Sequence, residues 1–322
     1  MAKSKTNKPK FKVKDNSALA KLNKVLAVIL VVLLVATIGI VCFSAPKVAS
    51  VEGTEEVKDE SVLETEFKAG TYAGIEFKSE EDVINFYKEA YDYSKTLTAQ
   101  YTDKDGNTQT YYKLLGEEKL EVGNIMIDGS SNAMINNLVP GIVDGLYSPG
   151  LNGLVPSTNR DPKLDTDAWD GNGESLATSR IVPEDILACN IADNGDGTVT
   201  VQLQPKAVNM SMPGADAQGH VFQTLGAIDK VVDGISVLSW SQGTTADNCK
   251  VNYKSGVATV KINAATKEIV EADYTMKAYV NVTHANVAVI KDKSASLDIT
   301  MQWKYPASAE YLQTSKGVTL VG

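Results

Sequence analysis

Two long stretches of alternating hydrophobic and polar residues near the C-terminus form the strongest pattern in the chain. Apolar side chains occupy every second position between residues 270 and 282, and again between residues 295 and 305. Successive side chains of a strand point to opposite faces, so the pattern predicts two antiparallel strands with one buried and one wet face. Both exceed the usual strand length of about 5–6 residues, so the sheet should be tall and curved.

Shorter alternating segments predict more strands. Residues 251–253 and 257–262 are expected to form a hairpin before the long strands. Residues 96–112 are expected to form another hairpin, because Asp105-Gly106 is a turn signal between two alternating segments. Further strands are expected around 121–127, 182–192 and 198–203.

Three segments carry apolar residues at the spacing of a helix with one buried face. The first spans 79–91 and begins at Ser79, where a hydroxyl followed by acids fits a helix N-terminus. The second spans 134–146 and the third 219–233. Their order among the strands predicts an α+β domain, with about three helices packed on one face of a curved antiparallel sheet. The buried stripes include Phe86, then Leu138 and Ile142, then Phe222 and Leu225.

An uncharged apolar segment near the N-terminus predicts a membrane anchor. Residues 25–44 contain no charge, and a helix of that length spans roughly 30 Å, the thickness of a bilayer core. Residues 1–24 hold eight lysines and one acid. The positive-inside rule therefore predicts a single-pass signal-anchor with the N-terminus in the cytoplasm and the C-terminal domain extracellular. A cleaved signal peptide is the alternative, although its apolar region is usually only about 7–15 residues.

These patterns divide the chain into a basic cytoplasmic tail (1–24), a transmembrane helix (25–44), an acidic stalk (45–68) and an exterior α+β domain (69–322). The stalk is charged and poor in large apolar side chains. The chain of 322 residues has a net charge of −9, and most of the acid lies beyond the tail. The membrane is an expected partner through the apolar segment 25–44. Nucleic acid is not expected, because an acidic exterior offers no basic stripe.

No cofactor is expected, with Ca²⁺ as the one open alternative. Only two histidines and three cysteines are present, which argues against zinc or iron–sulfur sites. The long polar loop at 148–178 contains Asp165, Asp167 and Asp170. Carboxylates are the ligands that Ca²⁺ prefers, yet the spacing fits no EF-hand, and a solvated loop is the other interpretation.

The two exterior cysteines, Cys189 and Cys249, are a candidate disulfide. The exterior is an oxidising compartment, and two cysteines are the minimum for a bridge. Two separate buried thiols are an equally good interpretation. A thiol enzyme would need a nearby histidine or a Cys-x-x-Cys spacing, and neither is visible.

Three stretches carry a resemblance to known proteins: residues 182–186 (VPEDI), residues 193–201 (DNGDGTVTV) and residues 299–305 (ITMQWKY). In this order they resemble uncharacterised membrane-anchored exterior proteins of Gram-positive, clostridia-like bacteria. A first helix followed by a curved antiparallel sheet is also distantly similar to carriers of the LolA and LppX type. That similarity implies an open half-barrel whose concave side, plugged by helices, holds acyl chains, and it implies no particular site residue.

The function predicted from the sequence is therefore an extracellular, membrane-anchored domain of a bacterial cell surface that binds an apolar or lipid ligand between sheet and helices. No Gly-x-Ser-x-Gly motif or other catalytic motif is present. The alternatives are a structural or protein-interaction domain with a filled core, and a cell-wall or glycan hydrolase with paired carboxylates. An apolar cavity of about 300–1,000 Å³ would favour the lipid reading. The candidate groove residues are Phe86, Leu138, Ile142, Phe222, Leu225, Tyr274, Met276 and Ala278.

Overall fold

The computed structural model describes residues 57–131, 179–226, 238–287 and 290–321, together with Ala133, Asn136, Asn137, Val232 and Asp233. Several predictions lie outside the described residues: the tail, the membrane segment 25–44, the groove candidates Leu138 and Ile142, and the loop acids Asp165, Asp167 and Asp170. Among the described residues, no helix is both long and apolar enough to cross a bilayer.

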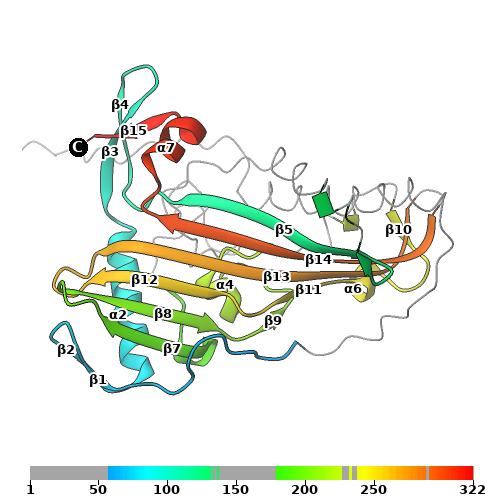
Figure 1. Ribbon diagram of the computed structural model, residues 1–322, viewed down its shortest axis with the longest axis horizontal. Coiled ribbons are helices and arrows are strands. Elements are labelled where there is room, and N and C mark those ends of the chain that lie inside the picture. The colour runs from blue at the N-terminus through cyan, green and yellow to red at the C-terminus, as the bar shows by residue number, and fades with distance from the viewer. Residues whose placement is uncertain are drawn as a thin grey trace, which may run out of the picture.

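A large antiparallel sheet forms the body of the molecule (Figure 1). Its main path follows the order β6-β5-β14-β13-β12-β8-β7. The two longest strands, β13 and β14, contain 19 and 16 residues, so the long alternating segments are confirmed as strands. The strands of this path are β5 (Glu117–Ile127), β6 (Ser130–Ser131), β7 (Ile186–Asp193), β8 (Thr198–Pro205), β12 (Val257–Asn263), β13 (Ile269–Val287) and β14 (Ile290–Tyr305).

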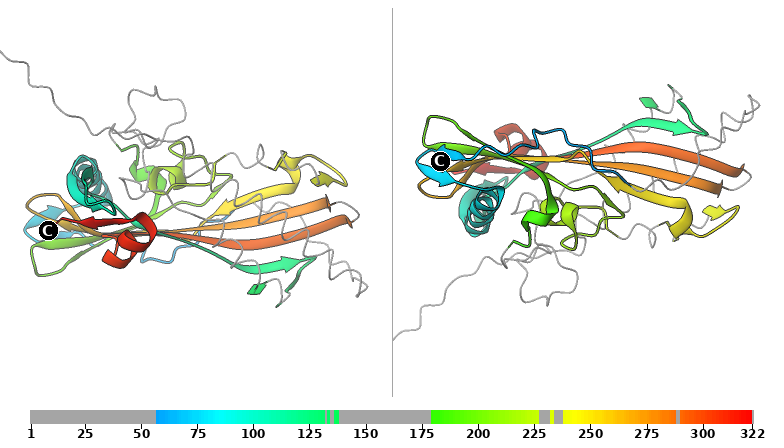
Figure 2. Two further views of the ribbon diagram at one scale, coloured as in Figure 1. Left: turned by 90° about the horizontal axis from the view of Figure 1, so that it is seen from above. Right: turned by 90° about the horizontal axis from the view of Figure 1, so that it is seen from below.

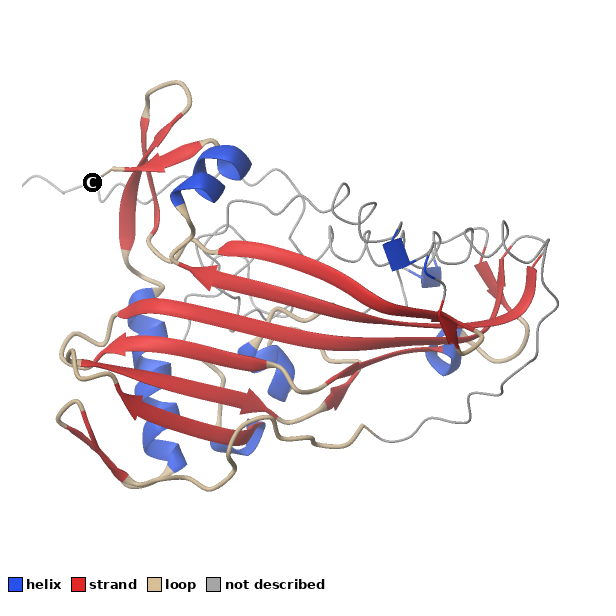
Figure 3. Ribbon diagram, viewed as in Figure 1, coloured by secondary structure: helices blue, strands red, loops and turns tan. Residues whose placement is uncertain are grey.

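Three shorter strands give the sheet two unlike halves. In the wide half, β12, β8 and β7 lie beside the first part of β13. In the narrow half, β11 (Cys249–Tyr253) and β10 (Leu238–Trp240) pair with the second part of β13, and β9 (Val208–Asn209) pairs with β11. Both halves use β13 as a common strand, as Figure 3 shows.

The predicted hairpin of residues 251–253 and 257–262 is wrong. The two strands, β11 and β12, pair with β13 one after the other instead of with each other: Tyr253 faces Ala278 and Val257 faces Thr275. The connection passes close to β13 at Gly256, where a Cβ would lie 2.9 Å from the Thr275 carbonyl oxygen. Strand β13 is long enough to hold both partners end to end, which local alternation does not reveal.

The predicted buried face of β13 is confirmed over most of its length. Ala272, Tyr274, Met276, Ala278, Val280 and Val282 are all buried. Val270 was assigned to the same face but is 37% exposed. A register shift opposite Lys261 and Ile262 places Ile269 inward in its stead, because a β-bulge adds one residue to a strand and reverses the faces beyond it.

The first predicted helix is confirmed. Helix α2 (Glu80–Ser94) begins after Ser79, whose hydroxyl oxygen accepts a hydrogen bond from the Asp82 backbone N–H. The Asp82 carboxylate in turn accepts from the Ser79 N–H at 3.0 Å, which completes a capping box. Helix α2 packs against the wide half of the sheet, as does the short helix α4 on the same face (Figure 2).

The third predicted helix, 219–233, is confirmed only in part: among its described residues, 219–221 and 232–233 are helical and 222–226 are not. Helix α4 covers only Ala217–Val221, and Phe222 already has an extended backbone. The Leu225 N–H donates a hydrogen bond of 3.1 Å to the Tyr253 hydroxyl oxygen. An extended chain brings both Phe222 and Leu225 into the core, where each is fully buried. This contact with a distant strand replaces the helix that the local spacing favours.

The remaining elements lie at the periphery. The hairpin at Asp105-Gly106 is confirmed, with Gly106 at φ +82°, but its strands join β15 in a separate three-stranded sheet. That sheet has a small core of its own, formed by Tyr101, Leu115, Leu312 and Val318. The peripheral elements are β1 (Gly70–Tyr72), β2 (Ile75–Phe77), β3 (Thr98–Asp103), β4 (Thr108–Tyr112), β15 (Val318–Leu320), the 3₁₀ turn η2 (Pro183–Asp185), α6 (Thr245–Asn248), α7 (Ala309–Tyr311) and the π turn η3 (Leu312–Lys316).

The described end of the predicted stalk is bound to the sheet. The Gln204 side chain accepts from the Val62 N–H at 2.8 Å and donates to the Glu60 carbonyl oxygen at 2.6 Å. The Ala207 N–H donates to the Asp59 carboxylate at 2.6 Å. The chain is thus fixed to the fold from Asp59 onward, before the boundary at residue 69 that the composition suggested. The charged composition of the segment indicates only that it is soluble. The buried side chain of a glutamine on β8 attaches it to the fold.

Candidate functional site

The space between sheet and helices is the site that the sequence predicted. Six of the eight groove candidates are described, and all six belong to one cluster of buried side chains. Phe222, Leu225, Tyr274, Met276 and Ala278 have no exposed surface, and Phe86 has 7%. The structure therefore brings the predicted residues together, but as the packed core of the wide half and its junction with the narrow half.

Buried tyrosines close this core. The hydroxyl oxygens of Tyr87 on α2 and Tyr274 on β13 lie 2.8 Å apart and form a hydrogen bond. Burial raises the pKa of Tyr87 and the pKa of Tyr274 well above the ordinary tyrosine value, so both stay neutral. Each hydroxyl satisfies the other inside an apolar environment, so this part of the core is closed without a ligand.

The candidate disulfide between Cys189 and Cys249 is wrong. Cys189 pairs with Leu203 at the β7 edge, whereas Cys249 pairs with Val282 near the far end of β13. Counted along the paired strands, the two positions lie eight residues apart, which is about 25 Å at the rise of a β-strand. A disulfide needs Cα atoms within about 7 Å of each other. Both thiols are buried, and burial raises the pKa of Cys189 to about 12.

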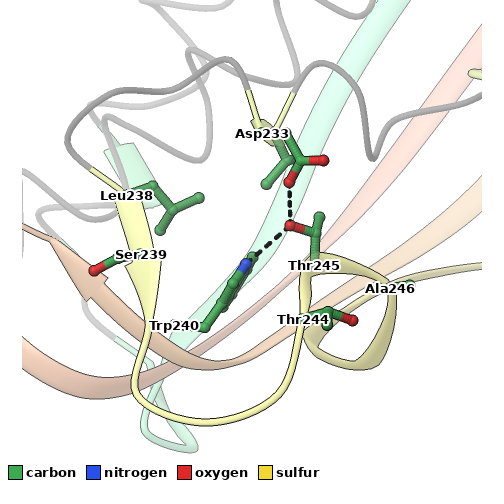
Figure 4. Close-up of a pocket in the computed structure, with 8 residues that line it drawn as sticks. Asp233, Leu238, Ser239, Trp240, Thr244, Thr245 and Ala246 are labelled. Atoms are coloured by element: carbon green, nitrogen blue, oxygen red, sulfur yellow. Dashed lines mark hydrogen bonds between the residues drawn. The ribbon is translucent and has the colours of Figure 1, made fainter.

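A hollow of about 440 Å³ opens at the narrow half of the sheet (Figure 4). We call it the Trp240 hollow. Strand β10, helix α6 and the short helical segment of Val232 and Asp233 form its described walls. Its lining residues are Val232, Asp233, Leu238, Ser239, Trp240, Thr244, Thr245 and Ala246.

Three polar groups in the Trp240 hollow are joined in series. The indole N–H of Trp240 donates to the Thr245 hydroxyl oxygen at 2.9 Å. The Thr245 hydroxyl donates to the Asp233 carboxylate, and Figure 4 shows both bonds. Trp240 is held by pairing with Ala285 on β13, and Thr245 stands in the first turn of α6, which a capping box between Thr244 and Asp247 fixes. The indole ring thus has a defined orientation at the wall of the hollow.

A second group of polar residues fastens the loop behind this wall. One oxygen of Asp292 accepts from the Ser241 hydroxyl at 2.6 Å and lies 2.8 Å from His284 Nδ1. The Ser241 N–H also donates to the His284 carbonyl oxygen. These contacts lower the pKa of Asp292 below its ordinary value. The group ties the loop between β10 and α6 to the β13–β14 hairpin.

This cluster contains a serine, a histidine and an aspartate without the geometry of a catalytic triad. In a triad the serine hydroxyl bonds to the histidine, which bonds to the acid. Here the Ser241 hydroxyl and His284 Nδ1 both approach the same Asp292 oxygen. The other histidine, His220, lies 2.8 Å from Asp185 and links α4 to η2. Both histidines therefore serve as connections between elements.

A smaller hollow of about 330 Å³ lies between β2 and α2. Its lining mixes the apolar side chains of Ile75, Phe77 and Phe86 with four charged residues of both signs, Glu76, Lys78, Asp82 and Glu89. Asp82 is already engaged in the helix cap. Within the described residues, no group of three or more His, Cys, Asp or Glu side chains is placed to hold a metal ion.

Comparison of the chain with protein-family models, with curated proteins and with solved structures found no match. The chemistry of the described surface is therefore the guide to function. Among the sequence-predicted site residues that the structure describes, none lines the Trp240 hollow. The available signal was the short alternating stretch Leu-Ser-Trp-Ser-Gln, in which a tryptophan is flanked on both sides by serine.

Proposed function

We propose that this protein is a membrane-anchored exterior binding domain whose ligand site is the Trp240 hollow. The observation that carries the proposal is the combination of an indole ring, a carboxylate and hydroxyl groups around a hollow of about 440 Å³. Small-molecule sites combine an apolar or aromatic surface with a few polar groups of fixed position, in volumes of about 300–1,000 Å³. The hydrogen bonds from Trp240 through Thr245 to Asp233 supply that fixed position.

Binding between the sheet and the helices receives less support. The six described groove candidates leave the wide half tightly packed, with aromatic side chains in mutual contact. A lipid there would have to displace Phe222 or Leu225, and Leu225 is also held through its backbone by Tyr253. The lipid reading thus requires an opening of the core, whereas the Trp240 hollow requires none.

The anchored arrangement rests on the sequence of residues 1–68, with the apolar segment 25–44 as the membrane helix. Asp59 is bonded to Ala207, so the span between the anchor and the fold runs from residue 45 to residue 58. Even fully extended, that span reaches only roughly 50 Å. The domain would thus work close to the outer membrane surface, where small surface components are at high local concentration.

The test uses a variant that blocks the hollow. Ala246 is an exposed lining residue of α6, so Ala246→Trp should fill the space without overpacking the core. The matched control is Ala265→Trp, at an exposed turn between β12 and β13 on the other end of the sheet. Full-length protein in an uncharged polyoxyethylene detergent would be titrated with disaccharides, quaternary amines and amino acids, with thermal unfolding as the readout.

The proposal expects at least one of these compounds to stabilise the wild type and the control but not Ala246→Trp. Compounds that stabilise all three proteins equally, or none, contradict it. A photoactivatable fatty acid fed to cells tests the opposing interpretation. Crosslinks at Phe222 or Tyr274 would favour a lipid bound between the sheet and the helices.

A further inference from the structure

We infer that residues 59–66 form a detachable strap between the membrane tether and the domain, and that its release lengthens the tether by eight residues. The strap belongs to the segment whose composition suggested a stalk. It lies between the β1–β2 hairpin and β9, in the blue part of the chain (Figure 1). Its detachment is independent of the Trp240 hollow, whereas its effect on the reach of the domain rests on the membrane anchor of the proposed function.

The end of the strap nearest the tether is held at two places on the sheet. The Ala207 N–H, just beyond β8, donates to the Asp59 carboxylate at 2.6 Å. The Gln204 side chain, which is fully buried, bonds to the strap main chain at the Glu60 carbonyl oxygen and the Val62 N–H. One glutamine amide thus holds the backbone of an extended segment through both its donor and its acceptor.

A third attachment follows further along the sheet. With its amide oriented to suit its neighbours, Asn190 donates to the Glu64 carbonyl oxygen at 3.2 Å, and Asn190 pairs with Gln202 on β8. The strap ends before Phe67, whose side chain packs against the core. The attachments therefore lie in order along β8, and a pull on the tether loads them one after another, beginning at Asp59.

Polar contacts with little apolar burial hold the strap. Val62 is 55% exposed, and neither Val62 nor Leu63 packs against the core cluster, whereas Phe67 does. The ion pair between Glu60 and Lys254 joins a carboxylate that is 59% exposed, and exposed pairs contribute little to stability. Segments with few buried apolar contacts open at a lower free energy than the whole domain. The strap can thus detach while the sheet stays folded.

A detached strap stays extended. Residues 59–66 contain four acids and no lysine or arginine, and charged linkers repel themselves and extend. An anionic membrane surface repels the same charges. Eight residues span at most roughly 28 Å, in addition to the roughly 50 Å available to residues 45–58. The domain therefore has a short reach from the membrane with the strap bound and a longer reach when load on the tether peels it away.

Hydrogen–deuterium exchange resolved to single amides, on full-length protein in the same detergent, tests the detachment. Two amides bond across the contact, the Val62 N–H on the strap and the Ala207 N–H on the body. Peeling from the tether end predicts that Ala207 is protected no more than Val62. Both should be at least about tenfold less protected than Val201, which pairs on both sides in the middle of β8. Protection equal to that of Val201 would mean that the strap opens only when the sheet unfolds, and would overturn the inference.

One exposed side chain tests whether the attachments open in sequence. Asp59→Ala removes the first bond and leaves the acceptor of the Val62 N–H in place. We expect it to lower the protection of Val62 about two- to tenfold, the change that corresponds to the net contribution of one hydrogen bond. The matched control is Glu66→Ala, which removes the same charge from the far end of the strap. Equal protection of Val62 in the two variants would show that the contacts are independent and that no strap peels.

Two double variants separate the open strap from the bound strap. The open variant, Asp59→Ala/Gln204→Leu, removes both attachments nearest the tether. The control variant, Glu66→Ala/Gln202→Leu, makes the same changes at positions that keep them, because the Gln202 side chain bonds to β12. We expect the open variant to leave the Val62 amide unprotected. The Lys206 N–H, which bonds to η2 in the body, should keep its protection in both variants, and its loss would mean that the sheet and not the strap has opened.

Energy transfer in phosphatidylcholine vesicles that carry an acceptor-labelled lipid measures the reach. The donor dye is attached at Ala265→Cys, in the exposed turn between β12 and β13, in a Cys42→Ser background. The open variant should transfer less energy to the bilayer than the control variant, and equal transfer would overturn the lengthening of the tether. If neither protein enters the vesicles, the anchor of the proposed function fails, while the exchange result still decides whether the strap detaches.

Discussion

The wide and narrow halves of the sheet share β13, yet they differ in how their inner surface is completed. In the wide half, the face of β13 is covered by α2 and by buried aromatic side chains such as Tyr87 and Trp303. In the narrow half, β10 and α6 border a hollow whose described lining includes hydroxyl side chains and the carboxylate of Asp233. One end of β13 therefore lies in a filled core, and the other end lies beside an open hollow.

Several bulges lie within the narrow half of the sheet. Register shifts occur between β13 and β14 beyond Val282 and between β14 and β5 beyond Ser296. Asn124, His284 and Asp292 adopt positive φ angles at these places. Bulges bend a strand and increase its twist, so the narrow end diverges from the wide end (Figure 2).

The sharpest contrast is between two tryptophans. Trp303 in β14 is 1% exposed, whereas Trp240 borders the hollow. Replacing a buried aromatic residue by alanine costs about 3–5 kcal/mol. We expect Trp303→Ala to lose that much free energy of unfolding and Trp240→Ala to lose about 1 kcal/mol, the scale of its hydrogen bond. Chemical denaturation followed by circular dichroism measures both, and equal losses would remove the contrast between the halves.

The next contrast uses two enlarged alanines. Ala278 is fully buried at the junction of the halves, so Ala278→Phe should overpack the core and cost about 1–3 kcal/mol. Ala246→Trp at the exposed wall of the hollow should change the free energy of unfolding by no more than about 0.5 kcal/mol. If Ala278→Phe is tolerated as well as Ala246→Trp, the core contains a void, and the lipid interpretation regains its basis.

Paired hydroxyl groups give a third comparison. Tyr87→Phe leaves the Tyr274 hydroxyl buried without its partner, and such a loss costs about 1–3 kcal/mol. The double variant Tyr87→Phe/Tyr274→Phe removes both groups and should be closer to the wild type than the sum of the single variants. Thr245→Val, at the hollow, should weaken ligand binding with little effect on unfolding. A double-mutant cycle that shows no coupling between the tyrosines would contradict the closed core.

The smallest effect concerns acid. A hydrogen bond with Lys261, aided by Thr198, lowers the pKa of Asp196 from 3.8 to about 2. A lowered carboxyl pKa means that its stabilisation is present above the unfolded value and is lost as the pH falls from about 4 toward 2. Asp196→Asn should therefore flatten the dependence of stability on pH in that window, with its loss of stability largest above about pH 4 and smallest near pH 2. Unfolding measured from pH 2 to pH 5 checks this, and an unchanged slope would contradict it.

Local patterns predicted the elements whose hydrogen bonds and burial are themselves local or strictly periodic. Helix α2 followed from its cap at Ser79 and its apolar stripe, and the faces of β13 and β14 followed from alternation. The segment after Val221 has apolar residues at a spacing that suits a helix, yet the bond from Leu225 to Tyr253 selects an extended chain. Such a long-range contact has no signature in the segment itself.

The candidate site was predicted less well for a related reason. Alternation places Tyr274 and Ala278 on the inner face but does not report whether that face is filled. The Trp240 hollow depends on the pairing of β10 with β13 and on the approach of Asp233 to Thr245. Asp233, Trp240 and Thr245 are close in sequence. Their side chains nevertheless meet at the hollow only because the chain reverses direction at α6.

A ligand in the Trp240 hollow should contact Trp240 and leave Trp303 untouched, and fluorine NMR reports on both side chains in one titration. The chain contains three tryptophans, Trp169, Trp240 and Trp303, so full-length protein labelled with 5-fluorotryptophan gives separate signals that the variants Trp240→Phe and Trp303→Phe assign. On titration with a compound that stabilises the wild type but not Ala246→Trp, we expect a saturable shift of the Trp240 signal and no change at Trp303. A shift at Trp303 with Trp240 unmoved would place the ligand in the core and contradict the account.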